Sequence, residues 1–88
     1  MLELKIKKSF EKDWRRLEKR GYDYAKLEEI VGLLISQKQL PDRCRPHKLV
    51  GNYVGFWECH IAPDWLLIYF VDDTSITLAY TGTHSDLF

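Results

Sequence analysis

The first apolar residues of the chain alternate with charged ones, and the next recur at helical spacing. Leu2, Leu4 and Ile6 are separated by Glu3 and Lys5, a period of two that predicts a strand with one buried face. Apolar residues then recur every three or four positions, which predicts two amphipathic helices. Their apolar stripes are Phe10, Trp14 and Leu17 in the first helix, and Leu27, Ile30, Val31 and Leu34 in the second.

Residues with strong capping preferences bound the two predicted helices. Ser9 is placed to cap the first helix, and Gly21 to end it in the left-handed conformation. Asp23 is placed to cap the second helix, which Pro41 closes. Because the connection between the helices is so short, we expect them to form an antiparallel hairpin.

Strand patterns fill the second half of the chain. Residues 41–52 contain two prolines and a glycine and predict a loop. Residues 53–61 alternate as a strand, and after a tight turn residues 66–71 are apolar on both faces, as in a central strand. The last strand alternates again, and its apolar face is formed by Ile76, Leu78 and Tyr80.

These elements predict one α+β domain spanning residues 1–88. The order is β-α-α-β-β-β, with the helix hairpin packed on one face of a small, largely antiparallel four-stranded sheet. The apolar face of the strand at 53–61 is expected to meet the helices. Glu58 and His60, which alternate with that face, then point to the open side of the sheet.

The formal net charge of zero hides a strong asymmetry. Residues 1–48 hold all thirteen lysines and arginines, and residues 49–88 hold none. Segregated positive charge can mark a surface for nucleic acid. For the first helix a solvated face is the better explanation of its basic residues, Lys12, Arg15, Arg16, Lys19 and Arg20.

Composition predicts a reduced, cytoplasmic protein. No run approaches the roughly 18 apolar residues of a membrane span, and the N-terminus has no signal-peptide pattern. With no export signal, the two cysteines are expected to be thiols. Cys59 lies in a strand pattern and is expected to be buried, whereas Cys44 lies in the predicted loop. The sequence leaves open a disulfide between them.

The candidate chemistry is concentrated in three histidines, His47, His60 and His84. An imidazole can take and give a proton near neutral pH. Two of them on opposite sides of a phosphodiester would provide a base for the 2′-hydroxyl and an acid for the leaving 5′-oxygen. Asp64, four residues beyond His60, is placed to orient an imidazole or stabilise its cation. We expect these side chains to converge on the open side of the sheet.

Trp65 and Phe88 offer aromatic faces for unstacked bases, as in single-stranded RNA recognition. Each candidate also has a simpler explanation. Trp65 is most often a core residue, Phe88 a frayed end, and Glu58 a solvated carboxylate, while a lone histidine is usually structural. A metal site of the histidines and Asp64 is a competing use, but the compact ligand spacing of known metal motifs is absent.

Three blocks of the chain resemble the YafQ-type branch of the RelE/ParE toxins: Pro46–Leu49, Glu58–Tyr69 and Thr81–Phe88. The opening strand, the helix hairpin and the length agree as well. The resemblance implies a RelE-like toxin of a type II toxin–antitoxin pair, which cuts messenger RNA in the ribosomal A site without a metal or another cofactor. It also implies an antitoxin that blocks the site, contact with operator DNA only through the antitoxin complex, and no contact with a membrane.

The resemblance carries the family's site onto individual residues. They are His47, His60, Asp64, Trp65, His84 and Phe88, with Glu58 a further member in some relatives. In this scheme His60, helped by Asp64, activates the 2′-hydroxyl, and His84 protonates the leaving oxygen. His47 contacts the phosphate, Trp65 positions a base, and the base and acid labels can be exchanged.

Two positions depart from many relatives, which carry arginine where this chain has Trp57 and Tyr80. An anionic transition state normally needs a positive or hydrogen-bonding partner. Protonated histidines, the Tyr80 hydroxyl, or Arg45 and Lys48 from the loop would have to serve instead. The alternative function is therefore a non-catalytic or weakly active member that binds antitoxin or ribosome. A gyrase poison of the same fold would have no need for proton-transferring histidines.

Overall fold

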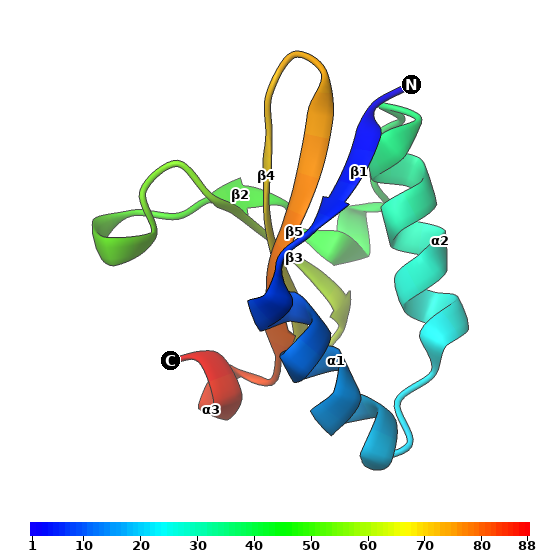
Figure 1. Cartoon of the computed structure of the whole chain (residues 1–88), viewed down its shortest axis with the longest axis vertical. Coiled ribbons are helices and arrows are strands. Elements are labelled where there is room, and N and C mark those ends of the chain that lie inside the picture. The colour runs from blue at the N-terminus through cyan, green and yellow to red at the C-terminus, as the bar shows by residue number, and fades with distance from the viewer.

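The computed structural model describes all 88 residues and contains one mixed sheet through the middle of the molecule (Figure 1). The strands are β1 (Glu3–Ile6), β2 (His47–Lys48), β3 (Trp57–Ala62), β4 (Trp65–Val71) and β5 (Ser75–Gly82). Their spatial order is β1-β5-β4-β3-β2. β1 runs parallel to β5, and every other pair of neighbours is antiparallel.

Two helices cover one face of this sheet. α1 (Lys8–Lys19) and α2 (Tyr24–Ile35) run in opposite directions, so the predicted hairpin and the α+β class are confirmed (Figure 1). The helix stripes meet the inward residues of the strands in one core. Its helix side is formed by Phe10, Leu17, Leu27, Ile30 and Val31, and its sheet side by Cys59, Ile61, Trp65, Leu67, Tyr69, Ile76 and Leu78.

The helix boundaries agree with the sequence except at the start of α1 and the end of α2. Ser9 lies inside α1 and caps nothing; its hydroxyl donates to the carbonyl of Ala79, 2.6 Å away, and so ties α1 to β5. Gly21 has a φ of 87° and follows α1 as predicted. Asp23 caps α2 as predicted, since its carboxylate accepts a backbone N–H of the first turn.

The segment between α2 and β3 is more ordered than a loop. α2 ends at Ile35, well before Pro41, so the prediction that Pro41 closes the helix is wrong. His47 and Lys48 pair with the edge of β3, which makes five strands where four were predicted. Two residues are too few to display an alternating pattern, and this explains the missed strand. Two short 3-10 turns flank this strand, η1 (Asp42–Cys44) and η2 (Gly51–Tyr53).

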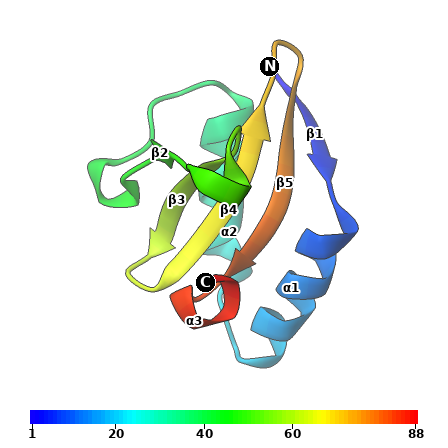
Figure 2. The ribbon, with the colours of Figure 1, turned by 90° about the vertical axis from the view of Figure 1, so that its left-hand side faces the viewer.

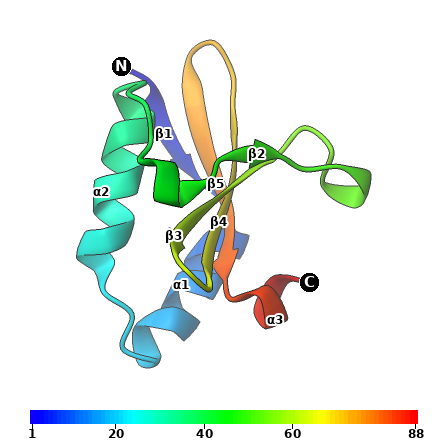
Figure 3. The ribbon, with the colours of Figure 1, turned by 180° about the vertical axis from the view of Figure 1, so that it is seen from behind.

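The face of the sheet away from α1 and α2 is covered only in part. The connection between β2 and β3 and the short helix α3 (His84–Leu87) lie on this side, opposite α2 (Figure 3). Figure 2 looks onto this face, with α3 in front of the lower end of the sheet. We call it the open face.

A bulge in β5 changes which side chains reach the open face. Leu78 and Tyr80 pair with successive residues of β4, which leaves Ala79 without a partner. Because the alternation is interrupted there, Tyr80 points to the face opposite Leu78. The prediction that Tyr80 shares a face with Ile76 and Leu78 is therefore wrong, and the bulge is what brings its ring to the open face.

Both cysteines are fully buried free thiols. Burial raises the pKa of the Cys59 thiol to about 12, and it also raises the pKa of Cys44. The structure therefore contains no disulfide between them. None of the helices has the length and apolar character that crossing a bilayer requires.

Candidate active site

A carboxylate–imidazole pair lies at the start of α3. The Oδ1 atom of Asp64 is 2.6 Å from Nδ1 of His84 and 3.1 Å from the backbone nitrogen of the same residue. These bonds, the side-chain one foremost, hold the pKa of the Asp64 carboxyl below its usual range. Because an ionised carboxylate only accepts hydrogen bonds, Nδ1 of His84 carries the hydrogen. Its Nε2 is then the ring nitrogen left to exchange a proton with a ligand.

The partner of Asp64 is therefore His84, and the expectation that it assists His60 is wrong. Asp64 lies in the turn between β3 and β4, and α3 follows β5, the strand beside β4. The turn and the start of α3 thus meet at one end of the sheet, although they are 20 residues apart in sequence. Although His60 is only four positions from Asp64, its Nδ1 atom contacts the carbonyl oxygen of Pro63 instead.

The ring of His60 lies next to that of His84 on the open face. Their centroids are 5.8 Å apart and the ring planes are inclined by 51°. The Nδ1 atom of His60 is 3.3 Å from the carbonyl oxygen of Pro63, which can only accept, so this nitrogen donates. The Nε2 atom is again the free one. Of the three histidines expected to converge, the structure brings the rings of His60 and His84 together. Each of the two rings is held through Nδ1.

His47 approaches the same face from β2. It is paired in register with Glu58, and its Nε2 atom is 3.3 Å from Oε1 of that residue. Its Nδ1 atom lies 3.0 Å from the carbonyl oxygen of Arg45. Nδ1 donates to the Arg45 carbonyl, and the contact of Nε2 with Glu58 is an ion pair when the ring is protonated. Glu58 is 6% exposed, which makes it a buried partner of His47 and not the solvated carboxylate of the simpler explanation.

Contacts with α1 fix the position of α3. Asp86 accepts hydrogen bonds from Nη1 of Arg20 at 2.8 Å and from the backbone nitrogen of Thr83 at 3.0 Å. Thr83 in return accepts the backbone N–H of Asp86 and completes a capping box directly before His84. The Arg20 bond is the main cause that holds the pKa of Asp86 far below its usual range. Arg20 is therefore an anchor for the His84 segment, contrary to the solvated-face prediction.

A cluster of aromatic rings extends from this site across the open face. Tyr53 in η2 is its centre, with ring centroids 5.7 Å from Phe88, 6.0 Å from Tyr80 and 6.4 Å from Phe56, all edge to face. Phe56 contacts Phe70 in the same way. Phe88 is 62% exposed and offers a free ring face to a ligand. Sequence reasoning missed Tyr53, because its only signal is an aromatic residue between two glycines in a predicted strand.

Trp65 belongs to the core and not to the open face. It is 2% exposed, stacks on Trp14 at 6.1 Å and meets the edge of Tyr22. Its indole nitrogen donates to the hydroxyl of Thr81 at 2.9 Å. With both faces and the polar atom used internally, the predicted role of stacking a base is wrong for Trp65.

The loop cations do not join the histidines as expected. Lys48 lies over the ring of Trp57, with Nζ 5.5 Å from the centroid. Since Lys48 and Trp57 pair in register next to the His47–Glu58 pair, strand alternation places them on the helix side of the sheet. Arg45 contributes its backbone carbonyl to His47. No group of three or more His, Cys, Asp or Glu residues is arranged to hold a metal ion.

Comparison with known proteins identifies the family. The family described as "Bacterial toxin of type II toxin-antitoxin system, YafQ" matches residues 2–88. The mRNA interferase toxin YafQ of Escherichia coli K12 is 38% identical over 80 residues, which cover 90% of this chain and 87% of that protein.

Solved structures agree along the whole chain. A copper-bound mutant toxin from Helicobacter pylori has a TM-score of 0.94 and 41% identity, with 100% of both chains covered. YafQ from E. coli BL21(DE3) has a TM-score of 0.94 and 32% identity, covering 100% of this chain and 99% of that one. YafQ in the E. coli DinJ–YafQ toxin–antitoxin complex has a TM-score of 0.90 and 34% identity, with 99% and 97% covered. The chain therefore belongs to the YafQ family of bacterial toxins of type II toxin–antitoxin systems.

Proposed function

We propose that this chain is an mRNA interferase, an endoribonuclease that cleaves messenger RNA on the ribosome by general acid–base chemistry. The observation that carries the proposal is the pair of imidazoles of His60 and His84, 5.8 Å apart and open to one surface. Each keeps its Nε2 atom free, because Nδ1 is occupied by a fixed acceptor. Two such groups supply both proton transfers of phosphodiester cleavage from the protein itself.

In the proposed reaction Nε2 of His60 takes the proton of the 2′-hydroxyl as its oxygen attacks phosphorus. The bond from phosphorus to the 5′-oxygen breaks, and Nε2 of His84 gives that oxygen a proton. The products are a 2′,3′-cyclic phosphate and a 5′-hydroxyl end. We assign the acid to His84 because the Asp64 carboxylate beside it stabilises the protonated ring, the form that a general acid needs at the start.

The remaining residues of the open face hold the substrate in this proposal. His47, held by Glu58 and the Arg45 carbonyl, lies beside the phosphate and adds positive charge there when its ring is protonated. The Tyr80 hydroxyl donates a hydrogen bond in place of the family arginine, and the exposed ring of Phe88 stacks on a base. Two side chains of the expected set, Trp65 and Lys48, have no part in it.

The proposed partners follow from the relatives. E. coli YafQ is solved in complex with the antitoxin DinJ. We propose that a cognate antitoxin likewise binds this chain and blocks its site, and that the complex, not the toxin alone, contacts operator DNA. The substrate is carried by the ribosome, so the proposed place of action is the cytoplasm.

The test is expression of the chain without an antitoxin, followed by mapping of message ends. Growth should stop, and cuts should lie at a fixed position within codons of translated messages only. Replacing His84 by Ala should abolish these cuts without unfolding the protein. Undiminished cutting by His84→Ala would contradict the mechanism, and growth with intact messages in the wild type would favour a non-catalytic binding module.

A further inference from the structure

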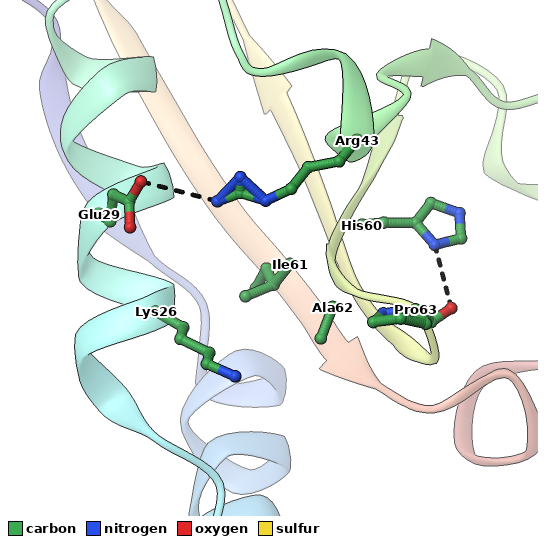
Figure 4. Close-up of a pocket in the computed structure, with 7 residues that line it drawn as sticks. All are labelled: Lys26, Glu29, Arg43, His60, Ile61, Ala62 and Pro63. Carbon is green, nitrogen blue, oxygen red and sulfur yellow. Dashed lines mark hydrogen bonds and ion pairs between the residues drawn. The ribbon is translucent and has the colours of Figure 1, made fainter.

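A cavity with charged residues at its rim lies beside the site, on the other side of β3 (Figure 4). It has a volume of about 360 Å³ and opens between α2, η1 and the turn from β3 to β4. The volume falls in the range of about 300–1,000 Å³ that small-molecule sites occupy. The lining is formed by Lys26, Glu29, Arg43, His60, Ile61, Ala62 and Pro63. We call it the Lys26 pocket.

The rim of the Lys26 pocket is positively charged and its floor is apolar. Arg43 and Glu29 form an ion pair of 3.6 Å, with side chains 58% and 59% exposed. Lys26 takes part in none of the ion pairs of the structure. The rim thus keeps one net positive charge above a floor of Ile61, Ala62 and Pro63. A nucleotide matches this arrangement, because its phosphate can bind at the rim while the flat face of its base packs on the floor.

The pocket is separated from the imidazoles by one strand edge. In Figure 4 the ring of His60 points to the side of β3 away from Lys26 and Arg43. Pro63 lines the pocket, and its carbonyl oxygen holds His60 at 3.3 Å. β2 pairs with only Trp57 and Glu58, so no strand pairs with the outer edge of β3 beyond Glu58. A single-stranded chain can therefore pass from the imidazoles over this edge into the pocket.

We propose that the Lys26 pocket binds a nucleotide of the RNA that flanks the scissile linkage, with its phosphate between Lys26 and Arg43. The inference rests on the function proposed above. The pocket supplies positive charge that the second half of the chain lacks, since residues 49–88 contain no lysine or arginine. An acidic peptide would use the cationic rim as well and could pair with the strand edge. RNA is favoured because Pro63 of the pocket lining also contacts the imidazole of His60.

The first test is the affinity of a labelled 2′-O-methyl RNA hexanucleotide, which cannot be cleaved because its attacking hydroxyl is blocked. Lys26→Gln and Arg43→Gln should each weaken binding about three- to tenfold in about 0.1 M salt. Each should also lower the slope of log affinity against log salt by roughly 0.7, the value for one lost phosphate contact on a single strand. Lys12→Gln removes the same charge from an exposed position of α1 and should change neither quantity.

Removal of the Glu29 charge should change RNA affinity in the opposite direction. Glu29→Gln frees Arg43 from its ion pair and raises the net charge of the rim, so the hexanucleotide should bind two- to threefold more tightly. A variant that merely disturbs the fold would not improve binding. Unchanged affinity and salt slope in all three pocket variants would overturn the proposal.

Cleavage in a translating extract separates this proposal from the function itself. If the wild type cuts and the pocket variants cut equally at limiting toxin, the pocket is not an RNA site although the function stands. If the wild type does not cut but the hexanucleotide binds as described, the pocket stands and the nuclease assignment fails. Loss of antitoxin affinity with unchanged RNA affinity would mark a protein site and refute the proposal. Affinity for ribosomes without message identifies the source of the nucleotide. If the pocket variants bind such ribosomes more weakly than the wild type, the nucleotide belongs to ribosomal RNA, and if they bind equally it belongs to the message.

Discussion

The two faces of the sheet are built on different principles. The helix face is apolar, and its contacts are made by residues whose spacing repeats along the chain, such as Leu67 and Ile76. The open face holds ionisable groups at strand ends and turns, each with one specific partner, such as Asp64 with His84. The first face therefore tolerates exchange of one apolar residue for another of similar volume, whereas the second depends on single atoms.

This contrast predicts that changes on the open face alter the reaction and changes on the helix face alter stability. The site on the open face needs little burial, since the side chains of His84 and Asp64 are 56% and 65% exposed. Removal of the His60 or His84 ring should therefore leave the core intact.

The largest effect is expected at the two imidazoles. His60→Ala and His84→Ala should each reduce single-turnover cleavage by about 10²- to 10⁴-fold, because each removes one general acid or base. A message with a 5′-bridging sulfur at the cut site assigns the roles, since a thiolate leaves without an acid. His84→Ala should regain most of its rate on that substrate and His60→Ala should not. Recovery by His60→Ala alone would reverse the assignment.

The next largest effect is expected in the core. Leu67 on the helix face is fully buried, and Leu67→Ala should lower the free energy of unfolding by about 2–5 kcal/mol. Urea denaturation measures this, with Leu67→Val as the milder variant if alanine prevents folding. Cleavage per folded molecule should stay within about twofold of wild type. A loss of cleavage in fully folded Leu67→Val would break the separation between the two faces.

Leu66 is the matched control from the other face. It is equally buried, but it pairs in register with His60. Leu66→Ala should cost similar stability and in addition lower cleavage per folded molecule, because it removes support beneath that ring. Equal behaviour of the two leucine variants in both assays would contradict the comparison.

The same contrast explains what could be predicted from the sequence. Repeating patterns identified α1, α2 and the three long strands, because burial of one face imposes a period on many residues at once. They missed β2, which is too short, and the bulge at Ala79, which shifts the pattern of β5 by one residue. The convergence of His60 and His84 followed from the expectation that strand ends and the C-terminal tail reach the open side of the sheet. The pairing of Asp64 with His84 did not, because it depends on which strand ends lie side by side.

Contacts across long sequence separations were the least predictable part. Arg20 looked like one more cation on a solvated helix face, yet it bonds Asp86, 66 residues away. The local sequence around Arg20 or Asp86 contains no pattern that predicts this pair. Trp65 was placed in a substrate role by its motif, and its burial between Trp14 and Tyr22 shows a core role instead. Position within a motif thus identified the region and misjudged a single side chain.

A moderate effect is expected at Asp86, which joins the two faces by tying α3 to α1. Asp86→Asn should lower the free energy of unfolding near neutral pH by about 1 kcal/mol, below the roughly 1.5–3 kcal/mol of a charged hydrogen bond, because the Arg20 partner is 42% exposed. The folded state depresses the pKa of Asp86, so its contribution is complete above the unfolded value of about 3.9 and declines as pH falls below it. The difference from wild type should therefore shrink below about pH 4. A difference that stays constant down to pH 2 would show that the charge is not its cause.

The smallest effect is expected at Tyr53, which supports the open face without contributing a proton. Its ring holds Phe88 and Tyr80 in place at 5.7 and 6.0 Å. Tyr53→Ala should lower cleavage about three- to tenfold, whereas Tyr53→Phe keeps the edge-to-face contacts, worth about 0.5–1.5 kcal/mol each, and should restore most of the rate. If Tyr53 acts through Phe88 and Tyr80, the alanine substitutions will not add, and Tyr53→Ala will cost nothing further once Phe88→Ala and Tyr80→Ala are both present. Full additivity would mean that Tyr53 contacts the RNA by itself. The open face would then hold two independent aromatic contacts in place of one supported ring.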